Sequence, residues 1–464
     1  MVIVTPTARR GHGRLPTLRR RLDAALRSPA AWYAGFAVYA VCVALFSGPG
    51  QDHWWGAWAA GGYALAAVIA VGRPTRGGRL AALGAALAGA LAGPAAWLSA
   101  TAPPTPDVTV VARSGVLLLH HGTPYLGPAA LAHGGWLAYD PYLPVMAVFG
   151  LPKALGLPGL LGDPRPWLAA ATFALVYATF LITVRRRRPA IALAAFFLAS
   201  PVLAFPLAMG ITDPPIIALT CLALAMLTRA RAGLWQAAVV LGAACAMKYT
   251  AWPALGVIVV MVAARDGARA ALRLGAAALG TAVGLAVALA PAALTSPAGI
   301  LRNTVAYPLG LTAARSPAQS PLPGHLLATL GPAGHAAAIA LLAAAGLALA
   351  VSLVIAPPGT PARAAWRTAL GLTALFALSP ATRFGYFVYP LALAGWMAVA
   401  ADHASATRFR VPRVAGIPAR AASYRMASSA SAVSPYLSSN RLTPAGSTSQ
   451  DSVTWVLPAT GVNV

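Results

Sequence analysis

Asp107 is the residue of this chain whose surroundings best suit chemistry. The chain has no glutamate and nine acidic residues in all. Asp107 follows the stiff stretch Pro103-Pro104-Thr105-Pro106, directly after an apolar run, so its carboxylate should lie close to the end of that run. A carboxylate held there can take a proton from an attacking hydroxyl group as a general base. We therefore predict a catalytic role for Asp107, and its alternative role is to cap a helix over 108–119.

Lys248 and Arg383 are the two cations best placed to bind a phosphate group. Lys248 lies beside Tyr249, between two short apolar runs, and Arg383 lies in a short polar stretch between the last two apolar runs. A cation at membrane depth costs free energy and therefore suggests a function. The alternative for Lys248 is a snorkelling side chain whose amine reaches the interface. Weaker candidates for the phosphate are Arg113 and Arg302.

Three further aspartates, Asp140, Asp163 and Asp213, each stand directly before a proline at the start of an apolar run. Such a pair is typical of a helix N-cap followed by proline at the first helical position. We predict a cap at Asp163. At Asp140 and Asp213 a role in substrate binding stays open beside the cap, and Asp52 is also expected to be a cap.

A metal or disulfide site is not expected. The three cysteines, Cys42, Cys221 and Cys245, all lie within apolar stretches. His120 and His121 are adjacent, so they cannot share one face of a helix. We therefore predict no metal ion and no cofactor.

The distribution of arginine predicts how these residues are oriented. Of the 34 basic residues 32 are arginine, and 27 of these fall in alternate gaps between apolar stretches. The Arg-rich gaps contain Arg9 to Arg27, Arg73 to Arg79, Arg185 to Arg188, Arg229/Arg231, Arg265 to Arg273, Arg363/Arg367 and the tail from Arg408. The other gaps contain five of the nine acidic residues. By the positive-inside rule the Arg-rich gaps and both termini are cytoplasmic, and the candidate site lies on the outer face of the cell membrane.

Composition excludes a soluble protein. Hydrophobic residues make up 59% of the chain and charged residues 9%, with a mean hydropathy of +0.70. A soluble domain carries about 25% charged residues. The net charge of +25 is spread over short gaps, where arginine orients helices and meets anionic lipid, so we expect membrane lipids and no nucleic acid as partners.

The predicted fold is all-α, with about twelve transmembrane helices. A helix needs about 20 apolar residues to cross a bilayer. The expected spans are 31–47, 54–72, 80–100, 166–184, 189–207, 215–228, 233–247, 251–264, 274–294, 335–356, 367–380 and 385–401. Residues 233–264 could also form one long helix. Arginines flank this region on both sides, so we favour a hairpin that turns at 248–250.

Three regions are predicted along the chain. Residues 1–28 form a basic cytoplasmic segment, 29–401 the transmembrane domain, and 402–464 a disordered cytoplasmic tail rich in Ser, Ala and Arg. Two outer loops, 101–165 and 295–334, are too long to be simple turns. The first contains apolar pieces at 108–119 and 142–161, for which we predict interfacial helices on the outer face.

Together these pieces resemble the GT-C superfold of membrane glycosyltransferases, especially the bacterial polyprenyl-phosphate-mannose-dependent α-mannosyltransferases. The resemblance covers roughly residues 100–400 and rests on the order of several short motifs. These are Asp107-x5-Arg113 with Gly122-x-x-Tyr125, Tyr139-Asp140-Pro141-Tyr142-x-Pro144, Gly210-Ile211-Thr212-Asp213, Ala246-Met247-Lys248-Tyr249-x-x-x-Pro253, and Ser379-Pro380 with Arg383 and Tyr386.

The resemblance implies an inverting transfer of mannose from a polyprenyl-phosphate donor to a glycan or lipid-linked acceptor. Asp107 would be the base, and Lys248 and Arg383 would bind the lipid phosphate. The other substrate-binding residues implied are Arg113, Tyr125, Asp140, Asp213 and Tyr249.

One departure from that family leaves a second candidate for the base. Its aspartate usually follows the first membrane helix, whereas two extra helices precede Asp107, so Asp52 is the alternative. We favour Asp107 because the sequence after it fits better. The rival function is a transporter or flippase for a lipid-linked or small polar substrate. A coupled transporter would need ionisable groups near the midplane of its helices, where this chain has almost none.

Overall fold

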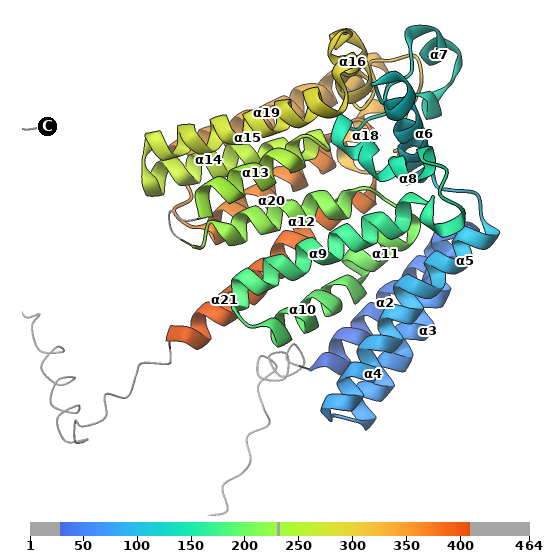
Figure 1. Ribbon diagram of the computed structural model, residues 1–464, viewed down its shortest axis with the longest axis vertical. Coiled ribbons are helices and arrows are strands. Elements are labelled where there is room, and N and C mark those ends of the chain that lie inside the picture. Colours follow the sequence, from blue (N-terminus) through green and yellow to red (C-terminus); the bar gives the residue numbers. More distant parts are fainter. Residues whose placement is uncertain (1–27, 230–232, 409–464) are drawn as a thin grey trace, which may run out of the picture. The chain divides into compact units, whose positions relative to one another are not determined.

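The computed structural model describes residues 28–229 and 233–408 (Figure 1). These residues form helices joined by turns, and the one β-type pairing among them is an isolated bridge between Gln319 and Thr382. The predicted all-α fold is therefore confirmed for this part of the chain. The basic segment 1–27 and the tail from 409 onward lie outside the described residues.

Each of the twelve stretches expected to span the membrane is helical. Half of them begin with proline at the first or second helical position, where its fixed φ suits a helix start. The helices are α2 (Pro29–Phe46), α3 (Gln51–Gly72), α4 (Arg76–Leu87) continuing through η1 (Ala88–Ala92) into α5 (Gly93–Thr101), α9 (Pro164–Val184), α10 (Arg187–Ala199), α11 (Pro201–Met209), α12 (Asp213–Met226), α13 (Leu234–Cys245), α14 (Trp252–Asp266), α15 (Ala268–Leu289), α19 (Pro332–Ile355), α20 (Pro361–Leu378), η8 (Phe384–Phe387) and α21 (Val388–Arg408).

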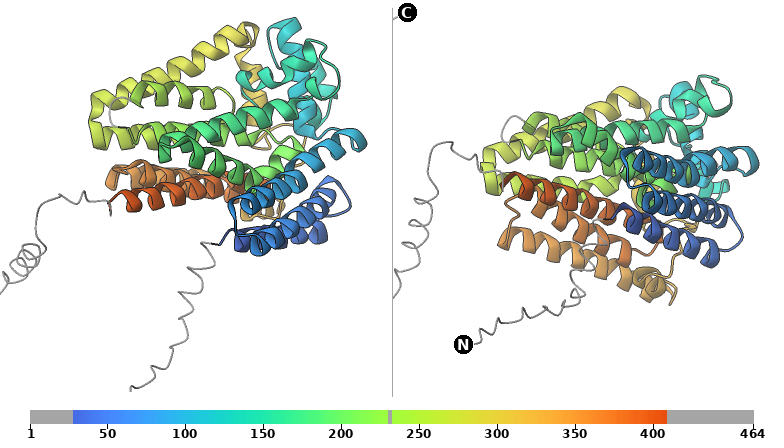
Figure 2. Two further views of the ribbon diagram at one scale, coloured as in Figure 1. Left: turned by 60° about the horizontal axis from the view of Figure 1, so that its bottom comes forward. Right: turned by 90° about the horizontal axis from the view of Figure 1, so that it is seen from below.

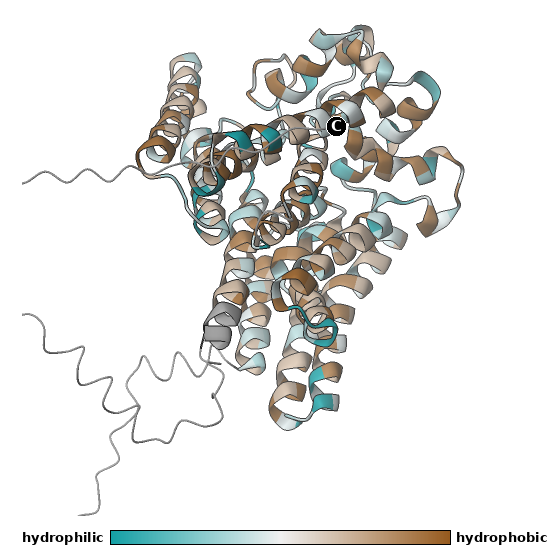
Figure 3. Cartoon of the chain, turned by 60° about the vertical axis from the view of Figure 1, so that its left-hand side comes forward, coloured by the Kyte–Doolittle hydropathy of each residue, from teal (hydrophilic) through white to brown (hydrophobic). Residues whose placement is uncertain are grey.

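Seven helical stretches among the described residues are long and apolar enough to cross a membrane. An eighth is added if α10 and α11, which meet at a bend of 63°, count as one span. Large apolar side chains such as Phe46, Val68 and Val354 are exposed on these helices. Figure 3 colours the helices by hydropathy and shows that apolar residues lie along most of their length. The chain is therefore a membrane protein. The crossing of α12, α13, α14 and α20 stays a prediction.

The region 233–264 is two helices and not one. Helix α13 ends at Cys245 and α14 begins at Trp252, and Lys248 has an extended backbone between them. The break predicted at this lysine is confirmed. At the other end of the chain, α21 continues past the expected boundary at 401 as far as Arg408.

The first helices pack with α10 and α11 around a hydrophobic core that is distinct from the larger one. Helices α2 to α5 pack around buried Tyr33, Trp55 and Tyr63, whereas α9, α12 to α15, α20 and α21 share a larger core. Figure 2 shows α2 to α5 in blue, side by side as one group. This group is attached to α10 and α11, where the Tyr63 hydroxyl donates to the carbonyl of Ala199 at 2.5 Å.

Arginine-rich gaps meet at one end of the helices. Arg185 and Arg229 line the same shallow depression, and the Arg265 guanidinium donates to the carbonyl of Leu227 at 2.7 Å. All three therefore lie at the C-terminal end of α12. That helix has 14 residues, so its first residue, Asp213, lies about 20 Å away at the opposite end. Three of the basic gaps are thus separated in space from the acidic gap that contains Asp213, as the sequence pattern predicts.

Labelling of single cysteines tests which end faces the cytoplasm. After replacement of the exposed native Cys42 by serine, cysteines at the exposed positions Gly48, Ala130 and Ala313 should react with a membrane-impermeant maleimide in whole cells. Cysteines at Gly77 and Ala268 should react only after lysis, because arginine-rich gaps stay inside. Labelling of 77 or 268 in intact cells would reverse the topology.

Candidate functional site

Short helices that do not span build the end of the molecule opposite the arginines. They are α6 (Pro106–His121), α7 (Pro128–His133), η2 (Trp136–Ala138), η3 (Pro144–Gly150), α8 (Leu151–Ala154), η4 (Gly159–Leu161), α16 (Pro291–Leu294), α17 (Pro297–Leu301), η7 (Arg302–Ala306) and α18 (Pro323–Ala328). The piece predicted at 108–119 is the single helix α6. The piece predicted at 142–161 is broken into short turns, because Pro144, Pro152 and Pro158 interrupt it.

Helix α6 fixes the position of Asp107. The cap of this helix is Thr105, whose hydroxyl oxygen accepts the N–H of Val108, so the expected alternative of Asp107 as the cap is wrong. The helix packs backbone to backbone on η3, where a Cβ at Gly115 would come within 2.2 Å of the carbonyl carbon of Gly150. Close packing of this kind leaves Asp107 little freedom to move.

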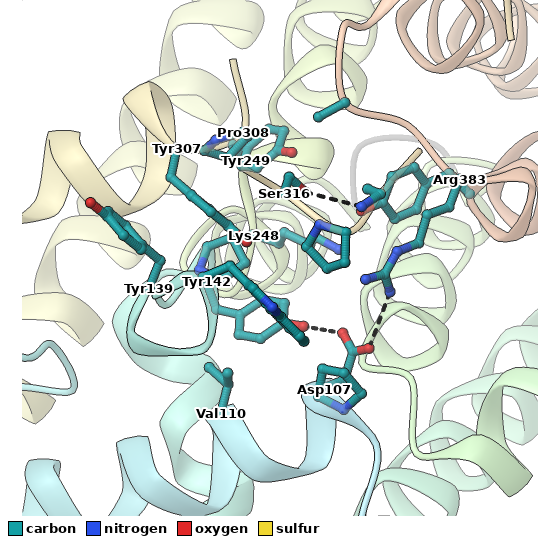
Figure 4. A pocket seen from close by; sticks show the side chains of 17 residues that line it. Asp107, Val110, Tyr139, Tyr142, Lys248, Tyr249, Tyr307, Pro308, Ser316 and Arg383 are labelled. Carbon is teal, nitrogen blue, oxygen red and sulfur yellow. Dashed lines mark hydrogen bonds and ion pairs between the residues drawn. The ribbon is translucent and has the colours of Figure 1, made fainter. Parts of the chain in front are cut away.

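The catalytic candidate and one phosphate candidate meet in the structure. The carboxylate of Asp107 accepts the hydroxyl of Tyr142 and forms an ion pair with Arg383, Nη1 to Oδ2, at 3.6 Å (Figure 4). The Asp107 side chain is 15% exposed and that of Arg383 is 35% exposed. The carboxylate of Asp107 and the guanidinium of Arg383 are thus close enough to interact. Both are also exposed enough for a ligand to come between them.

Lys248 lies deeper and has a partner of its own. Its Nζ atom lies 2.6 Å from Oδ1 of Asp213, and the rings of Tyr142 and Tyr386 cover it at 5.4 and 5.3 Å. Both charged side chains are almost completely buried. A snorkelling lysine would place its amine at the surface, so that alternative is wrong. Lys248 still lines the pocket described below.

Asp213 is not a helix cap. It is the first residue of α12, and its carboxylate accepts the hydroxyl of Tyr389 at 2.8 Å in addition to Lys248. The same Tyr389 hydroxyl lies 2.7 Å from the hydroxyl of Thr250. This buried network joins the start of α12, the break between α13 and α14, and helix α21. Tyr389 and Thr250 were not expected, because no local pattern marks them.

Asp140 is a buried brace and not a helix cap. Its carboxylate accepts the hydroxyl of Ser114 at 2.6 Å and the backbone N–H of Tyr142 at 2.9 Å. Its own N–H donates to the side-chain carbonyl of Asn303 at 2.8 Å. Burial raises the pKa of Asp140 to about 6, although these hydrogen bonds and nearby Arg113 act to lower it. The brace ties the loop of Tyr142 to α6 and η7.

Two other predicted binding residues also hold this loop. The guanidinium of Arg113 donates to the carbonyls of Leu137 and Ala138 at 2.5 and 3.1 Å, and the hydroxyl of Tyr125 donates to the carbonyl of Tyr142 at 2.8 Å. Neither lines the pocket. In this structure both act by shaping the loop.

The remaining polar candidates do not line the pocket, although Asp52 lies close enough to Arg383 to interact with its charge. Asp163 caps α9 by accepting the N–H of Arg165 at 2.8 Å, as predicted, and also pairs with that arginine at 2.7 Å. Asp52 is exposed in the first turn of α3, whose N-cap is Gly50, so the cap expected at Asp52 is wrong. Arg302 is exposed at the start of η7. Neither Asp52 nor Arg302 lines the pocket, so Asp107 stays the stronger candidate for a base.

The pocket brings together residues from distant parts of the sequence. Aromatic rings make up much of its wall, as Figure 4 shows, and the cavity has a volume of about 70 Å³. Its charged and aromatic lining residues are Asp107, Trp136, Tyr139, Tyr142, Lys248, Tyr249, Tyr307, Arg383 and Tyr386. Tyr139 and Tyr307 stack with ring centroids 4.6 Å apart. Nowhere in the described ranges do three or more metal-ligating side chains form a cluster. Proton transfer and the binding of an anion are the chemistry that these side chains offer.

No known protein family, no curated protein and no solved structure matches this chain.

Substitution of Lys248 should destabilise the fold. Removing one partner of a buried ion pair leaves the other charge uncompensated, at a cost of about 3–5 kcal/mol. We therefore expect Lys248→Met to lower the free energy of unfolding in detergent by that amount. The double variant Lys248→Met with Asp213→Leu should recover most of the loss. Equal stability of the single variant and the native chain would show that the pair is not buried as described.

The raised pKa of Asp140 predicts a pH-dependent stability. The folded state holds the proton more tightly than the unfolded chain, whose pKa is about 3.9. The contribution of Asp140 to the free energy of unfolding is therefore present at low pH and is lost as the pH rises through about 6. In the variant Asp140→Asn the side chain is neutral at every pH. Its oxygen can still accept the N–H of Tyr142, and its amide nitrogen can donate to the hydroxyl of Ser114. This variant should therefore melt higher than the native chain at pH 8, with the difference fading below pH ~4. A variant that melts lower at pH 8 would contradict this account.

Proposed function

We propose that this protein is a glycosyltransferase of the cytoplasmic membrane with its active site on the outer face. It transfers a sugar, mannose by the resemblance of the motifs, from a polyprenyl-phosphate donor to a glycan or lipid-linked acceptor. The observation that carries the proposal is the pairing of Asp107 with Arg383 in a tyrosine-lined pocket opposite the arginine-rich gaps. That pairing puts a general base beside a phosphate ligand.

The donor phosphate takes the place of Asp107 as the partner of Arg383. The contact is long, at 3.6 Å, and both side chains are partly exposed, so the exchange costs little. A guanidinium matches two phosphate oxygens at once, which makes it a strong ligand for this group. Asp107 is then free to accept a proton, while Tyr142 keeps its carboxylate oriented.

A single displacement accounts for the transfer. The acceptor hydroxyl oxygen forms a bond to the anomeric carbon, and its proton passes to the carboxylate of Asp107. The bond between the anomeric carbon and the phosphate oxygen breaks, and its electron pair leaves with the polyprenyl phosphate. One displacement inverts the configuration of the sugar. The acceptor oxygen and the phosphate lie on opposite sides of the anomeric carbon.

Charge develops on the departing phosphate, where the cations of the pocket are placed. The phosphate changes from a diester to a monoester and gains one negative charge. Arg383 meets this charge directly. Lys248 adds a weaker attraction from the pocket wall. Its contribution is weaker because Asp213 already balances most of the charge of the lysine. Electrostatic groups fixed before the reaction supply much of the rate enhancement in many enzymes.

Access for the donor requires a loop to move. The cavity volume of about 70 Å³ is below the range of about 300–1,000 Å³ that is usual for small-molecule sites. Tyr307, Pro308 and the segment 316–318 cover one side of the pocket. This stretch of the chain belongs to the second long loop, so we assign it the role of opening for the donor.

The positions of the buried charges favour an enzyme over a transporter. A coupled transporter binds its substrate and ions near the bilayer midplane. Lys248 and Asp213, a buried ion pair that could serve such a role, lie at the end of α12 opposite Arg185, Arg229 and Arg265, and they line or support the same pocket as Asp107.

Substitution of Asp107 tests the proposed base. In Asp107→Asn the amide can still accept the Tyr142 hydroxyl and Thr105 still caps the helix, so folding should be preserved. Asparagine cannot take a proton, so the rate of transfer from a radiolabelled polyprenyl-phosphate sugar should fall by about 10²–10⁴. The matched control Asp163→Asn keeps its cap and should leave the rate almost unchanged.

Two results would change this assignment. Full activity of Asp107→Asn with loss of activity in Asp52→Asn would move the base to α3 and make the leading helices part of the enzyme core. Full activity of both variants would remove the general base from the mechanism.

A further inference from the structure

A second and larger cavity lies beside the pocket of Asp107. Its volume is about 500 Å³, which is within the usual range of about 300–1,000 Å³ for small-molecule sites. The two cavities share Ser316, Ala318 and Ala381 as lining residues. One thin wall of protein therefore separates them.

This wall is also the element that positions Arg383. The backbone of 318–320 pairs with Thr382, whose N–H donates to Ala318 and whose carbonyl accepts from Ser320, both at 2.9 Å. The N–H of Phe384 donates to the hydroxyl of Ser320 at 3.0 Å. Arg383 stands between these two anchors with an extended backbone. The same residues thus hold the phosphate ligand on one side and close the second cavity on the other.

The second cavity has a different chemical character from the first. Its polar lining comes from the loop after η7, from α18 and from the start of α19. The polar side chains are Thr312, Arg315, Ser316, Gln319, His325, Thr329 and His335. Its described lining contains no carboxylate, whereas the first pocket contains Asp107. Four of these side chains, those of Thr312, Gln319, His325 and Thr329, already hydrogen-bond to backbone carbonyls. The cavity therefore offers a ligand their remaining hydrogen-bonding capacity and one permanent positive charge.

One polar atom in the lining of the second cavity lacks a hydrogen-bond partner among the described residues. The ring of His335 lies under Gly310, and its Nε2 atom is buried without a hydrogen bond to any described residue. A buried polar atom of this kind costs free energy until a water molecule or a ligand hydroxyl meets it.

We propose that the second cavity is the acceptor subsite of the transferase, and that it binds a glycan carrying a negatively charged group at Arg315. This inference rests on the function proposed above. Hydroxyl, amide and imidazole groups both donate and accept hydrogen bonds, as sugar hydroxyls require. The guanidinium of Arg315 suits a phosphate or a carboxylate. Because Ser316 and Ala318 stand between the cavities, the terminal sugar reaches Asp107 when the segment 316–318 moves as proposed above.

A binding experiment without any donor tests this subsite. The full chain, purified in detergent, is titrated with methyl α-mannoside, with its 6-phosphate and with inorganic phosphate. The phosphorylated sugar should bind at least about tenfold more tightly than either of the others, because it uses both the hydroxyl-binding lining and Arg315. Equal binding of inorganic phosphate and the phosphorylated sugar would overturn the glycan site and leave a simple anion site.

Three variants locate the binding. Arg315→Gln should bind the phosphorylated and neutral sugars equally. Thr329→Trp should lose both, because the new ring fills the cavity from an exposed position. The matched control Arg302→Gln removes an exposed arginine that lines neither cavity and should bind like the native chain. Unchanged binding in both Arg315→Gln and Thr329→Trp would overturn the proposal.

A transfer assay separates this inference from the proposed function. In an active preparation, Arg315→Gln should raise the KM for an anionic acceptor about tenfold with little change in donor binding. Binding of the phosphorylated sugar at Arg315 without any transfer by the native chain would mean that the cavity is a glycan site but that the protein is not the proposed enzyme. Transfer with an unchanged KM in Arg315→Gln would retain the enzyme and reject this subsite.

Discussion

The buried ion pair between Lys248 and Asp213 is the contact on which the site depends. Removing two charges from water is costly, and the cost is met only if both charges arrive together with further hydrogen bonds. Here the start of α12 supplies Asp213, the break after α13 supplies Lys248, and α21 supplies Tyr389. These three elements must therefore meet at one point. The rings of Tyr142 and Tyr386 then cover the amine and form part of the pocket wall.

A second ion pair, between Asp107 and Arg383, has the opposite properties. It is longer and more exposed than the first, and a two-segment backbone bridge holds the arginine in place. The four charges of the two pairs sum to zero, so the site has no uncompensated positive charge for an anionic ligand. Such a ligand can bind a cation of the site only if one of the two ion pairs separates. The exposed pair can open at low cost, whereas the buried pair cannot. In this account Lys248 and Asp213 build the site, and Asp107 and Arg383 perform the chemistry.

The sequence predicted what depends on local patterns. Apolar runs located every helix expected to span, and the Asp163-Pro164 pair located a helix cap. Asp140 and Asp213 follow the same pattern, yet their carboxylates bind residues far along the chain, Ser114 and Lys248 among them. Local spacing carries no information on such partners. Asn303 and Tyr389 were missed for the same reason, because only the folded helices bring them to the site.

The most direct test of this account is to follow labelled donor in sided proteoliposomes. The purified chain is reconstituted with radiolabelled polyprenyl-phosphate-mannose, and a membrane extract is added outside as the source of acceptor. We predict that the label leaves the donor, enters the acceptor fraction and releases polyprenyl phosphate on the outer side. Movement of intact labelled donor from one leaflet to the other, with no label in the acceptor fraction, would contradict the account and indicate a flippase.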